Sequence, residues 1–343
     1  MKPDIRSLTY EQLNDAVIAH GGQKFRTGQI YGWLHQKGVM SFDEMNNVPL
    51  SLRQSLQQEY GLSTVRVLKK LVSEIDGTVK YLFELCDSET VETVVMRYKH
   101  GLSVCISTQV GCKMGCSFCA STIAGFVRHL TAGEMEAQIL AASNDLGERI
   151  GNVVMMGIGE PLDNFDNTVL FLKNITDERG QNLSARHISL STCGLPHKIR
   201  ELADENMPIT LCLSLHAPND ALRETIMPVN KVYKLAEVID ACSYYQSVTG
   251  RRISFEYTLI SGVNDSEECA DQLIRLCKKL MCHVNLIPVN HVEETGYKQS
   301  VAKQMQLFCD KLKSKNVNAT LRRTLGQDIS AACGQLRRKE MNK

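Results

Sequence analysis

Three cysteines stand close together near the end of the first third of the chain. Cys112, Cys116 and Cys119 have the spacing CxxxCxxC, and Phe118 directly precedes the third of them. A complete iron–sulfur site usually supplies one thiolate to each of four irons, so three thiolates leave one iron of a [4Fe–4S] cube open. An open iron can chelate the amino and carboxylate groups of S-adenosylmethionine, and an electron from the cluster can then cleave its sulfonium bond to give a radical. The spacing therefore predicts a radical-generating site with these two cofactors.

Two other uses of three clustered cysteines are a structural zinc site and a group of buried thiols. Structural zinc almost always has four N or S ligands, commonly as two separated pairs, and no second pair lies nearby in the sequence. The pattern therefore favours the iron–sulfur site. The scattered cysteines are interpreted as small core or surface residues; they are Cys86, Cys193, Cys212, Cys242, Cys269, Cys277, Cys282 and Cys309.

Composition is that of a globular protein long enough for two or three domains. The chain has 343 residues, of which 43% are hydrophobic and 22% charged, and its formal net charge is +1. No apolar run approaches the roughly 20 residues that cross a bilayer, and the N-terminus lacks the apolar core of a signal peptide. Thirteen cysteines without an export signal indicate the reducing cytoplasm, where thiols serve metals or catalysis. An RNA partner would need only local basic patches, for which the candidates are Lys69-Lys70, Arg251-Arg252, Arg322-Arg323 and Arg337-Arg338-Lys339.

The spacing of apolar residues divides the chain into three parts. Residues 1 to about 60 are predicted to be helical, because residues such as Leu13, Val17 and Ile18 recur at helical spacing. Residues 62 to 107 are β-rich, with a hairpin turn at Asp76-Gly77. From about residue 103 strands alternate with helices, which predicts a parallel sheet, either a barrel or doubly wound, with its site at the C-terminal strand ends. The triad directly follows the first of the expected strands, which are 103–107, 152–156, 187–191, 209–215, 253–259, 283–287 and 318–321.

Several ordered segments make the chain recognisable as a whole. They are Val91-Glu-Thr-Val94, Cys105 to Cys112, Met156-Gly-Ile-Gly-Glu-Pro161, Ser189-Leu-Ser-Thr192, Leu213-Ser-Leu-His216, Asn285-Leu-Ile-Pro-Val-Asn290, Arg322-Arg-Thr-Leu-Gly-Gln-Asp-Ile and Ala331-Ala-Cys-Gly-Gln335. In this order they resemble the RlmN/Cfr family of radical S-adenosylmethionine RNA methyltransferases, nearly end to end. The resemblance implies an α/β fold, a partial (β/α)6 barrel. It also implies a helical accessory domain for RNA at 1–60, a β-rich connecting segment at 61–100, and the barrel with a C-terminal cysteine loop at 101–343.

The resemblance assigns residues to both cofactors. The three cysteines of the triad would hold the cluster, and Gly159 with Glu160 would contact S-adenosylmethionine, the carboxylate meeting its methionine ammonium. The other implied contacts are Ser191, Ser214, Leu215, His216 and Asn290. Without the family, the Gly-Glu-Pro segment is a turn after a strand, and His216 is a strand-end histidine with its hydrogen bonds satisfied.

Three further residues carry the reaction that the resemblance implies. Cys333 would take a methyl group as a thioether, for which a thiolate is a good nucleophile, and would deliver the carbon to RNA through a transient crosslink. Cys105 would resolve the crosslink by attacking the sulfur of Cys333, leaving a transient disulfide. Glu92 would accept the proton of the ring. On the residues alone, Cys333 is a packed residue near a helix end, Cys105 an inward core thiol, and Glu92 a solvent-facing strand residue.

The implied substrate is adenosine 2503 of 23S ribosomal RNA, methylated at carbon 2, with transfer RNAs left open as a second substrate. Carbon 2 of adenine is electron-poor and has no lone pair, so a radical can react where a nucleophilic displacement fails. An adenine inside structured RNA must also be extruded to reach the cluster. A reducing partner such as flavodoxin and a monomeric state are implied as well.

Three alternatives stay open at this point. A relative of the Cfr type would methylate carbon 8 of the same nucleotide with the same cysteines, although Gly159-Glu-Pro161 and Arg322-Arg-Thr324 favour carbon 2. A different radical enzyme would share the triad but would not need Cys105, Cys333 and Glu92 together. A noncatalytic iron–sulfur protein that binds RNA or senses redox state would leave the Gly-Glu-Pro and Ser-Leu-His segments without a use.

Overall fold

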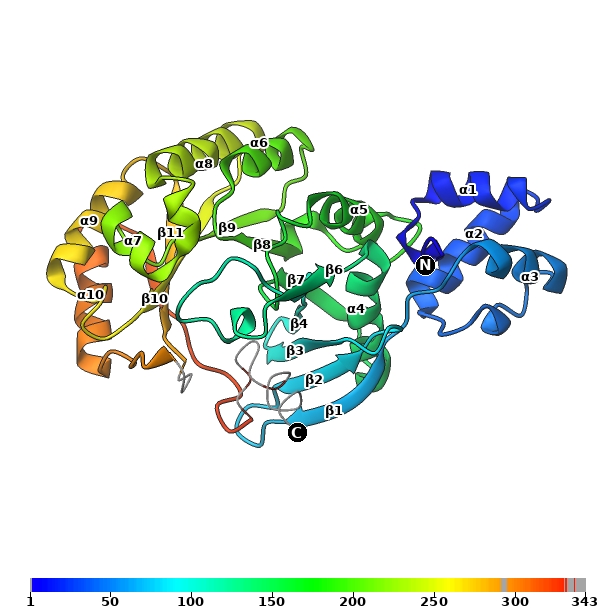
Figure 1. The fold of residues 1–343 in the computed structure, drawn as a ribbon, viewed down its shortest axis with the longest axis horizontal. Coiled ribbons are helices and arrows are strands. Elements are labelled where there is room, and N and C mark those ends of the chain that lie inside the picture. The colour runs from blue at the N-terminus through cyan, green and yellow to red at the C-terminus, as the bar shows by residue number, and fades with distance from the viewer. Residues whose placement is uncertain (1, 291–294, 330, 332–335, 337–343) are drawn as a thin grey trace.

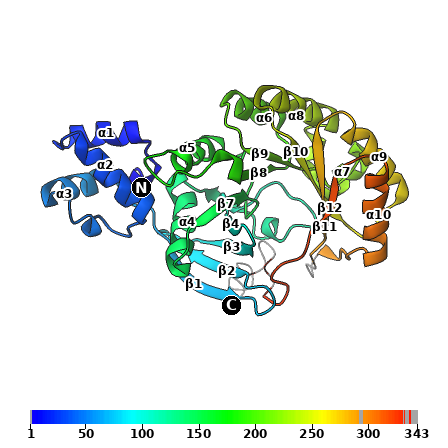
Figure 2. The same ribbon diagram turned by 180° about the vertical axis from the view of Figure 1, so that it is seen from behind.

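One sheet of ten strands runs through the structure, a computed structural model that describes residues 2–290, 295–329, 331 and 336. Its first strands, β1 (Arg66–Val72), β2 (Val79–Glu84) and β3 (Thr90–Tyr98), are antiparallel to one another and to β4 (Gly101–Cys105). From β4 onward every neighbouring pair is parallel, and β1 and β12 are the two edges (Figures 1 and 2). These parallel strands follow β4 in the order β7 (Ile150–Met155), β8 (Ile188–Thr192), β9 (Thr210–Ser214), β10 (Ile253–Leu259), β11 (Cys282–Pro288) and β12 (Ala319–Leu321).

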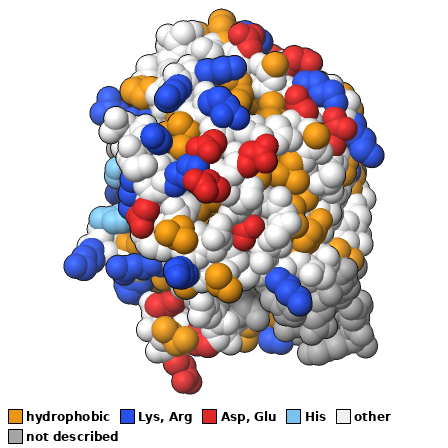
Figure 3. All heavy atoms as spheres, turned by 90° about the vertical axis from the view of Figure 1, so that its left-hand side faces the viewer, with side chains coloured by type: hydrophobic (Ala, Val, Ile, Leu, Met, Phe, Trp, Pro, Cys, Tyr) orange, Lys and Arg blue, Asp and Glu red, His pale blue; other side chains and the backbone are white. Residues whose placement is uncertain are grey.

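Helices connect the parallel strands and cover their outer face (Figure 1). Lys311 pairs with both Glu267 and Asp271 at 2.8 Å across two of these helices, and the same outer side shows charges of both signs among scattered hydrophobic side chains (Figure 3). The arrangement is the predicted open (β/α) barrel, and each of the seven predicted strands lies within two residues of its expected bounds. The connecting helices are α4 (Ala132–Leu146), α5 (Phe165–Thr176), α6 (Pro196–Asp204), α7 (Asp220–Ile226), α8 (Leu235–Thr249), α9 (Glu267–Cys277) and α10 (Ala302–Ser314).

Local signals explain where these elements begin and end. In β8, Ile188 and Leu190 are fully buried in the main apolar core, whereas Ser191 alternates with them and faces the inside of the barrel. Helix α4 begins with a capping box in which Thr131 and Glu134 bond each other's backbone N–H groups, and it ends at Gly147 in the left-handed conformation.

The β-rich segment at 61–100 extends the barrel sheet instead of bridging two separate bodies. The predicted turn forms between β1 and β2, with Gly77 at φ 70°. Strand β3 pairs with β2 on one side and β4 on the other, in a register that sets Lys80 opposite Val94 and Val94 opposite Cys105. Side chains of directly paired residues point to the same face of a sheet, so β2 and β3 present residues to the same space as the barrel strand β4.

The N-terminal part is helical, as predicted, with an apolar core of its own. Leu13 and Val17 lie in that core, whereas Ile18 is 52% exposed, so only part of the expected apolar stripe is inward. No described helix in the protein has the length and apolar character to span a membrane. The N-terminal elements are the single turns η1 (Ile5–Ser7) and η3 (Phe42–Glu44), the helices α1 (Tyr10–Ala19), α2 (Phe25–Tyr31) and α3 (Leu50–Glu59), and a π-helical continuation of α2, η2 (Gly32–Lys37).

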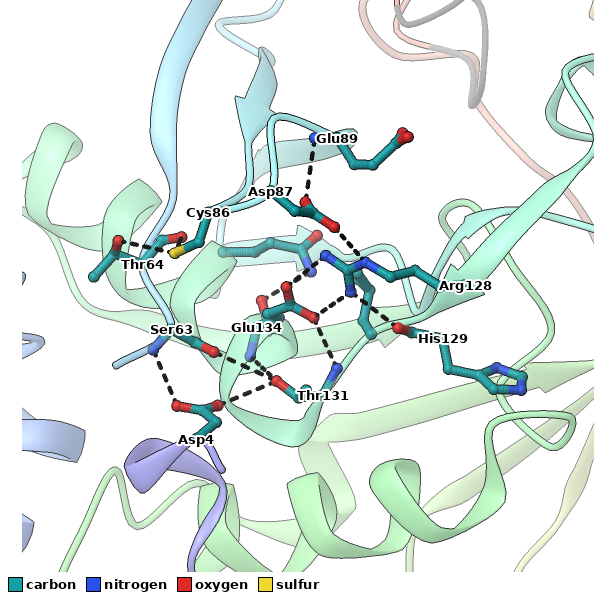
Figure 4. A network of polar contacts seen from close by, with 12 residues as sticks. Asp4, Ser63, Thr64, Cys86, Asp87, Glu89, Arg128, His129, Thr131 and Glu134 are labelled. Carbon is teal, nitrogen blue, oxygen red and sulfur yellow. Dashed lines mark hydrogen bonds and ion pairs between the residues drawn. The ribbon is translucent and has the colours of Figure 1, made fainter. Parts of the chain in front are cut away.

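A polar network joins the N-terminal part to the barrel at the start of α4 (Figure 4). Asp4 accepts hydrogen bonds from the Ser63 backbone N–H at 3.0 Å and from the Thr131 hydroxyl at 3.1 Å. Arg128, just before α4, bridges Asp87 at 2.7 Å and Glu134 at 2.8 Å. These contacts hold the N-terminal part against the helix that follows the cysteine loop.

Candidate functional site

A cavity of about 800 Å³ opens at the C-terminal ends of the parallel strands. Eleven of the thirteen residues predicted from the sequence line it: Glu92, which comes from the antiparallel part of the sheet, and ten others. Leu215 does not line the cavity, because its side chain is fully buried in the core. Cys333 lies outside the described residues. The ten are Cys105, Cys112, Cys116, Cys119, Gly159, Glu160, Ser191, Ser214, His216 and Asn290.

The cysteine loop lies between two strands that the sequence analysis did not predict. After β4 the chain forms β5 (Gln109–Gly111), and β6 (Phe126–His129) returns antiparallel to it. The triad was expected directly after β4. Instead it occupies the loop of this hairpin. Gly111 closes the base of the loop: its φ is 75°, and a Cβ atom there would overlap the carbonyl of Gly125.

The environment of the triad suits thiolates that bind a positively charged centre. Burial raises the pKa of Cys112 to about 12. Burial and the charges of Cys119 and Cys112 raise the pKa of Cys116 as well. Such thiols stay protonated until a cation binds to them, and the iron of a cluster would be that cation. The described residues contain no group of three His, Cys, Asp or Glu side chains arranged around a single metal ion, so the cluster rests on the thiol spacing and on the family reported below.

Glu160 is fixed by backbone groups from two strand ends. Its carboxylate oxygens accept hydrogen bonds from the N–H groups of Leu162 at 3.0 Å and Cys193 at 2.7 Å. Burial raises the pKa of Glu160, and these donors oppose that change. Gly159, at φ 113°, leaves no room for a side chain against Gln109, whose amide oxygen accepts from the Glu160 N–H at 2.9 Å. The carboxylate is thus held at the cavity wall with lone pairs left for a ligand.

The Ser-Leu-His segment places Ser214 and His216 at the end of β9, next to Ser191 at the end of β8. The hydroxyls of Ser191 and Ser214 lie 3.1 Å apart. His216 has φ 55°, and its Nδ1 accepts from the Thr258 N–H at 3.0 Å. Burial, followed by the charge of Arg223, lowers the pKa of His216 to about 3. The imidazole is therefore neutral, with its proton on Nε2. His216 is thus a strand-end histidine with a satisfied hydrogen bond, as interpreted without the family. It also lines the cavity.

A second polar group faces the cavity from the antiparallel strands. Glu92 is 2% exposed, so the interpretation that it faces solvent is wrong, and Lys80 Nζ lies 2.9 Å from its carboxylate with no exposure at all. Cys105 ends β4 in the same space. Burial raises the pKa of Cys105 to about 11, and the charge of Arg322 is the largest influence in the opposite direction.

The sequence did not predict three charged residues of the site: Glu256 and Arg322, which line the cavity, and Lys80, which contacts the cavity residue Glu92. Lys80 could have been noticed as an ionisable residue within an apolar strand. Glu256 points into the barrel from β10 and accepts hydrogen bonds from Ser254 at 2.9 Å and Asn285 at 2.8 Å, while burial raises the pKa of Glu256. Arg322 was interpreted as part of a surface basic pair, but it lines the cavity.

Comparisons with known proteins identify the fold and the family. The sequence model of the Radical SAM superfamily matches residues 106–274. The solved structure of a radical SAM methyltransferase from Sphaerobacter thermophilus superposes with a TM-score of 0.92 at 40% identity, covering 97% of this chain and 98% of that one. An open barrel with a CxxxCxxC loop at its strand ends is thus the structure of a radical S-adenosylmethionine enzyme.

Full-length relatives narrow this class. The model of the Ribosomal RNA large subunit methyltransferase N-terminal domain matches residues 4–61. Two proteins named probable dual-specificity RNA methyltransferase RlmN, from Clostridium novyi and Alkaliphilus oremlandii, are 50% and 53% identical, over 98% and 99% of both chains. The chain belongs to the RlmN family of radical S-adenosylmethionine RNA methyltransferases.

Family membership confirms several predictions together. The protein is an RNA methyltransferase of the radical type, and its cofactors are a [4Fe–4S] cluster and S-adenosylmethionine. It is an enzyme and not the noncatalytic module kept as an alternative. The domain bounds and the roles of single residues stay predictions.

Proposed function

We propose that the protein methylates carbon 2 of adenosine 2503 in 23S ribosomal RNA, and that certain transfer RNAs are a second substrate. The observation that carries this proposal is that one cavity brings together the predicted cofactor residues with Glu92 and Cys105, and that Lys80 pairs with Glu92. The relatives named for dual specificity support the second substrate. The cytoplasm, where ribosomal RNA is found, is the proposed location.

The cavity residues divide into two sets with different tasks. Cys112, Cys116 and Cys119 would hold the cluster, and the polar residues from Gly159 to Asn290 described above would hold S-adenosylmethionine. Bound there, the two cofactors supply the one-electron chemistry that an electron-poor ring carbon requires. The protein's own task is to orient them, exclude water and place the target base over Glu92.

We assign the covalent steps to two thiols. Cys333 carries the methyl carbon as a thioether and passes it to the ring while remaining attached to the RNA. Cys105 then attacks the sulfur of Cys333, and the bond from that sulfur to the carbon breaks. The carbon keeps the electron pair and takes up a proton to become the methyl group, while a disulfide links the two cysteines. Support comes from Cys105, which lies beside Glu92 and Arg322 in the cavity.

Glu92 is proposed to accept the ring proton, which requires that it be ionised although it is buried. A buried carboxylate without a partner takes up a proton instead of keeping its charge. Lys80 at 2.9 Å supplies the opposite charge and so keeps the carboxylate ready as a base. Lys80 and Glu92 stand on two paired strands, which fixes the orientation of the Glu92 carboxylate.

The test is incubation of the reconstituted enzyme with protein-free 23S ribosomal RNA, or with transfer RNA, plus reductant and S-adenosylmethionine. Digestion and mass spectrometry then report the methylated nucleoside. We expect 2-methyladenosine from both RNAs. A product of 8-methyladenosine would place the protein with the Cfr-type relatives. Cofactor cleavage without any methylated adenosine would show that the proposed substrate is wrong. Flavodoxin can be compared with a chemical reductant in the same assay, and the monomeric state by sizing.

A further inference from the structure

Arg223, on the short helix α7, is a fully buried cation behind the cofactor segments. Its guanidinium donates to four oxygens, all of them neutral. Nε donates to the Leu215 carbonyl at 3.0 Å, and Nη1 donates to the Asn230 side chain at 3.1 Å. Nη2 donates to the carbonyls of Cys193 at 2.6 Å and Ser214 at 3.1 Å. One side chain thus ties together the segments that follow β8 and β9.

These hydrogen bonds satisfy the donors of Arg223 but do not neutralise its charge. A buried charge is costly unless an opposite charge is near. The carboxylate of Asp220 accepts instead from the Asn230 amide at 2.9 Å and the Leu235 N–H at 2.8 Å. The four acceptors of the guanidinium carry no negative charge. An anionic cluster on the neighbouring cysteine loop would supply the charge that complements this cation.

Helix α7 is in direct contact with the cysteine loop. The Ser117 N–H, between two members of the triad, donates to the Ile226 carbonyl at 2.9 Å. Ile226 and Met227 also form an apolar cluster against which Cys116 and Phe118 pack. The backbone of α7 and the loop that would hold the cluster are thus joined by a hydrogen bond and by packing, with the guanidinium on the same short helix.

We infer that Arg223 positions the cofactor segments and, as a fixed positive charge behind Cys116, raises the reduction potential of the [4Fe–4S] cluster. A cube bound by three thiolates is anionic and becomes more so when it accepts an electron. A cation in a low-dielectric surrounding stabilises the reduced state more than the oxidised one. The enzyme must reduce this cluster before its cofactor can react, so Arg223 makes that reduction easier. The inference rests on the cofactors, not on the proposed RNA substrate.

The test is a redox titration of the reconstituted cluster, followed by electron paramagnetic resonance without RNA or S-adenosylmethionine. Arg223→Gln removes the charge and keeps hydrogen-bond donors, and we expect a more negative midpoint potential. Arg223→Lys keeps the positive charge but loses the planar set of guanidinium donors. The potential of the cluster in this variant should stay near that of the wild type, while S-adenosylmethionine binds more weakly. Arg200→Gln, a matched deletion of a partly exposed arginine on α6, should leave the potential unchanged.

A second variant keeps the inference testable if Arg223→Gln fails to assemble a cluster. Asp220→Asn removes a carboxylate on the same helix α7 with an isosteric side chain, and the potential should then become less negative. Equal potentials in the wild type and Arg223→Gln at equal iron content would overturn the electrostatic role. The same holds if Asp220→Asn leaves the potential unmoved, or if Arg223→Lys shifts it as far as Arg223→Gln does. Because no RNA is present, failure here is separate from failure of the proposed function.

Discussion

Lys80 Nζ and a carboxylate oxygen of Glu92 lie 2.9 Å apart on neighbouring strands, and neither side chain reaches solvent in any appreciable part. Glu92 is two residues from Val94, which faces Lys80 on one side and Cys105 on the other. Alternation along β3 puts Glu92 and Val94 on the same face. The ion pair and the thiol that ends β4 therefore belong to one surface, and that surface is a wall of the cavity.

Replacing Lys80 by Met should leave Glu92 without its counter-charge. The base then loses the cation that holds it in place, and we expect methyl transfer in a single turnover to slow by roughly 100-fold or more, the usual value of a general base. Cofactor cleavage without RNA should persist, because the cysteine triad is untouched. Lys99→Met, in the exposed turn after β3, is the matched control. Equal methylation rates for Lys80→Met and Lys99→Met would count against a role for the pair.

The double variant Lys80→Met/Glu92→Gln separates stability from catalysis. Breaking one half of a buried ion pair costs about 3–5 kcal/mol, whereas replacing both charges is far less costly. The double variant should therefore recover most of the free energy of unfolding that Lys80→Met loses, yet remain inactive. Denaturant unfolding of the three chains measures the first quantity, and the methylation assay measures the second.

Replacing Cys105 by Ala should trap the protein on its RNA. Without the resolving thiol the link through Cys333 persists, so chains purified from an expression culture should carry nuclease-sensitive extra mass. Cys86→Ala, which removes an exposed cysteine, should yield unattached protein. Unattached and active Cys105→Ala protein would refute the resolving role.

Because His216 is buried in its neutral form, the free energy of unfolding should decrease as the pH falls below 6.5. The unfolded chain binds a proton below pH 6.5, and the folded chain does so only near pH 3, because burial lowers the pKa of His216 to about 3. Between these values the wild type should lose up to about 1.4 kcal/mol of unfolding free energy per pH unit. His216→Asn, a residue type that tolerates positive φ, should show a shallower decline on anaerobic urea unfolding at about pH 7 and pH 5.5. Parallel declines would contradict the depressed pKa.

We expect that assembly of the cluster requires Gly111, whereas folding of the barrel does not. In Gly111→Ala the new methyl group overlaps the Gly125 carbonyl, so we expect iron per chain to fall by half or more while circular dichroism stays that of the wild type. Gly77→Ala imposes a similar φ, 70°, but meets nothing within 4 Å; it should cost about 1–2 kcal/mol and leave iron content unchanged. A full iron complement in Gly111→Ala would show that the loop can rearrange.

The sequence predicted the parallel strands well because each is a short apolar run bounded by turns, a signal that is local. The β5–β6 hairpin escaped prediction since Gln109–Gly111 and Phe126–His129 are too short to show alternation. The partners of buried charges escaped for another reason. Lys80 and Glu92 lie on the two strands of one hairpin, and only the strand register decides that they meet. Arg223 resembles any polar residue of a short helix until tertiary packing buries it. Leu215 was grouped with its neighbours by motif, although alternation turns its side chain away from the cavity.

The position of β4 in the sheet has a consequence for how this protein can vary. It pairs antiparallel with β3 and parallel with β7, so the proposed acid–base residues on one side and the proposed cofactor residues on the other belong to one hydrogen-bonded sheet. A slip of β3 by one residue would turn Glu92 to the opposite face and separate the proposed proton acceptor from the proposed radical source, with every strand still formed. Insertions at the β3–β4 turn should therefore abolish turnover in folded protein, whereas insertions of equal length in helical connections leave the two halves aligned.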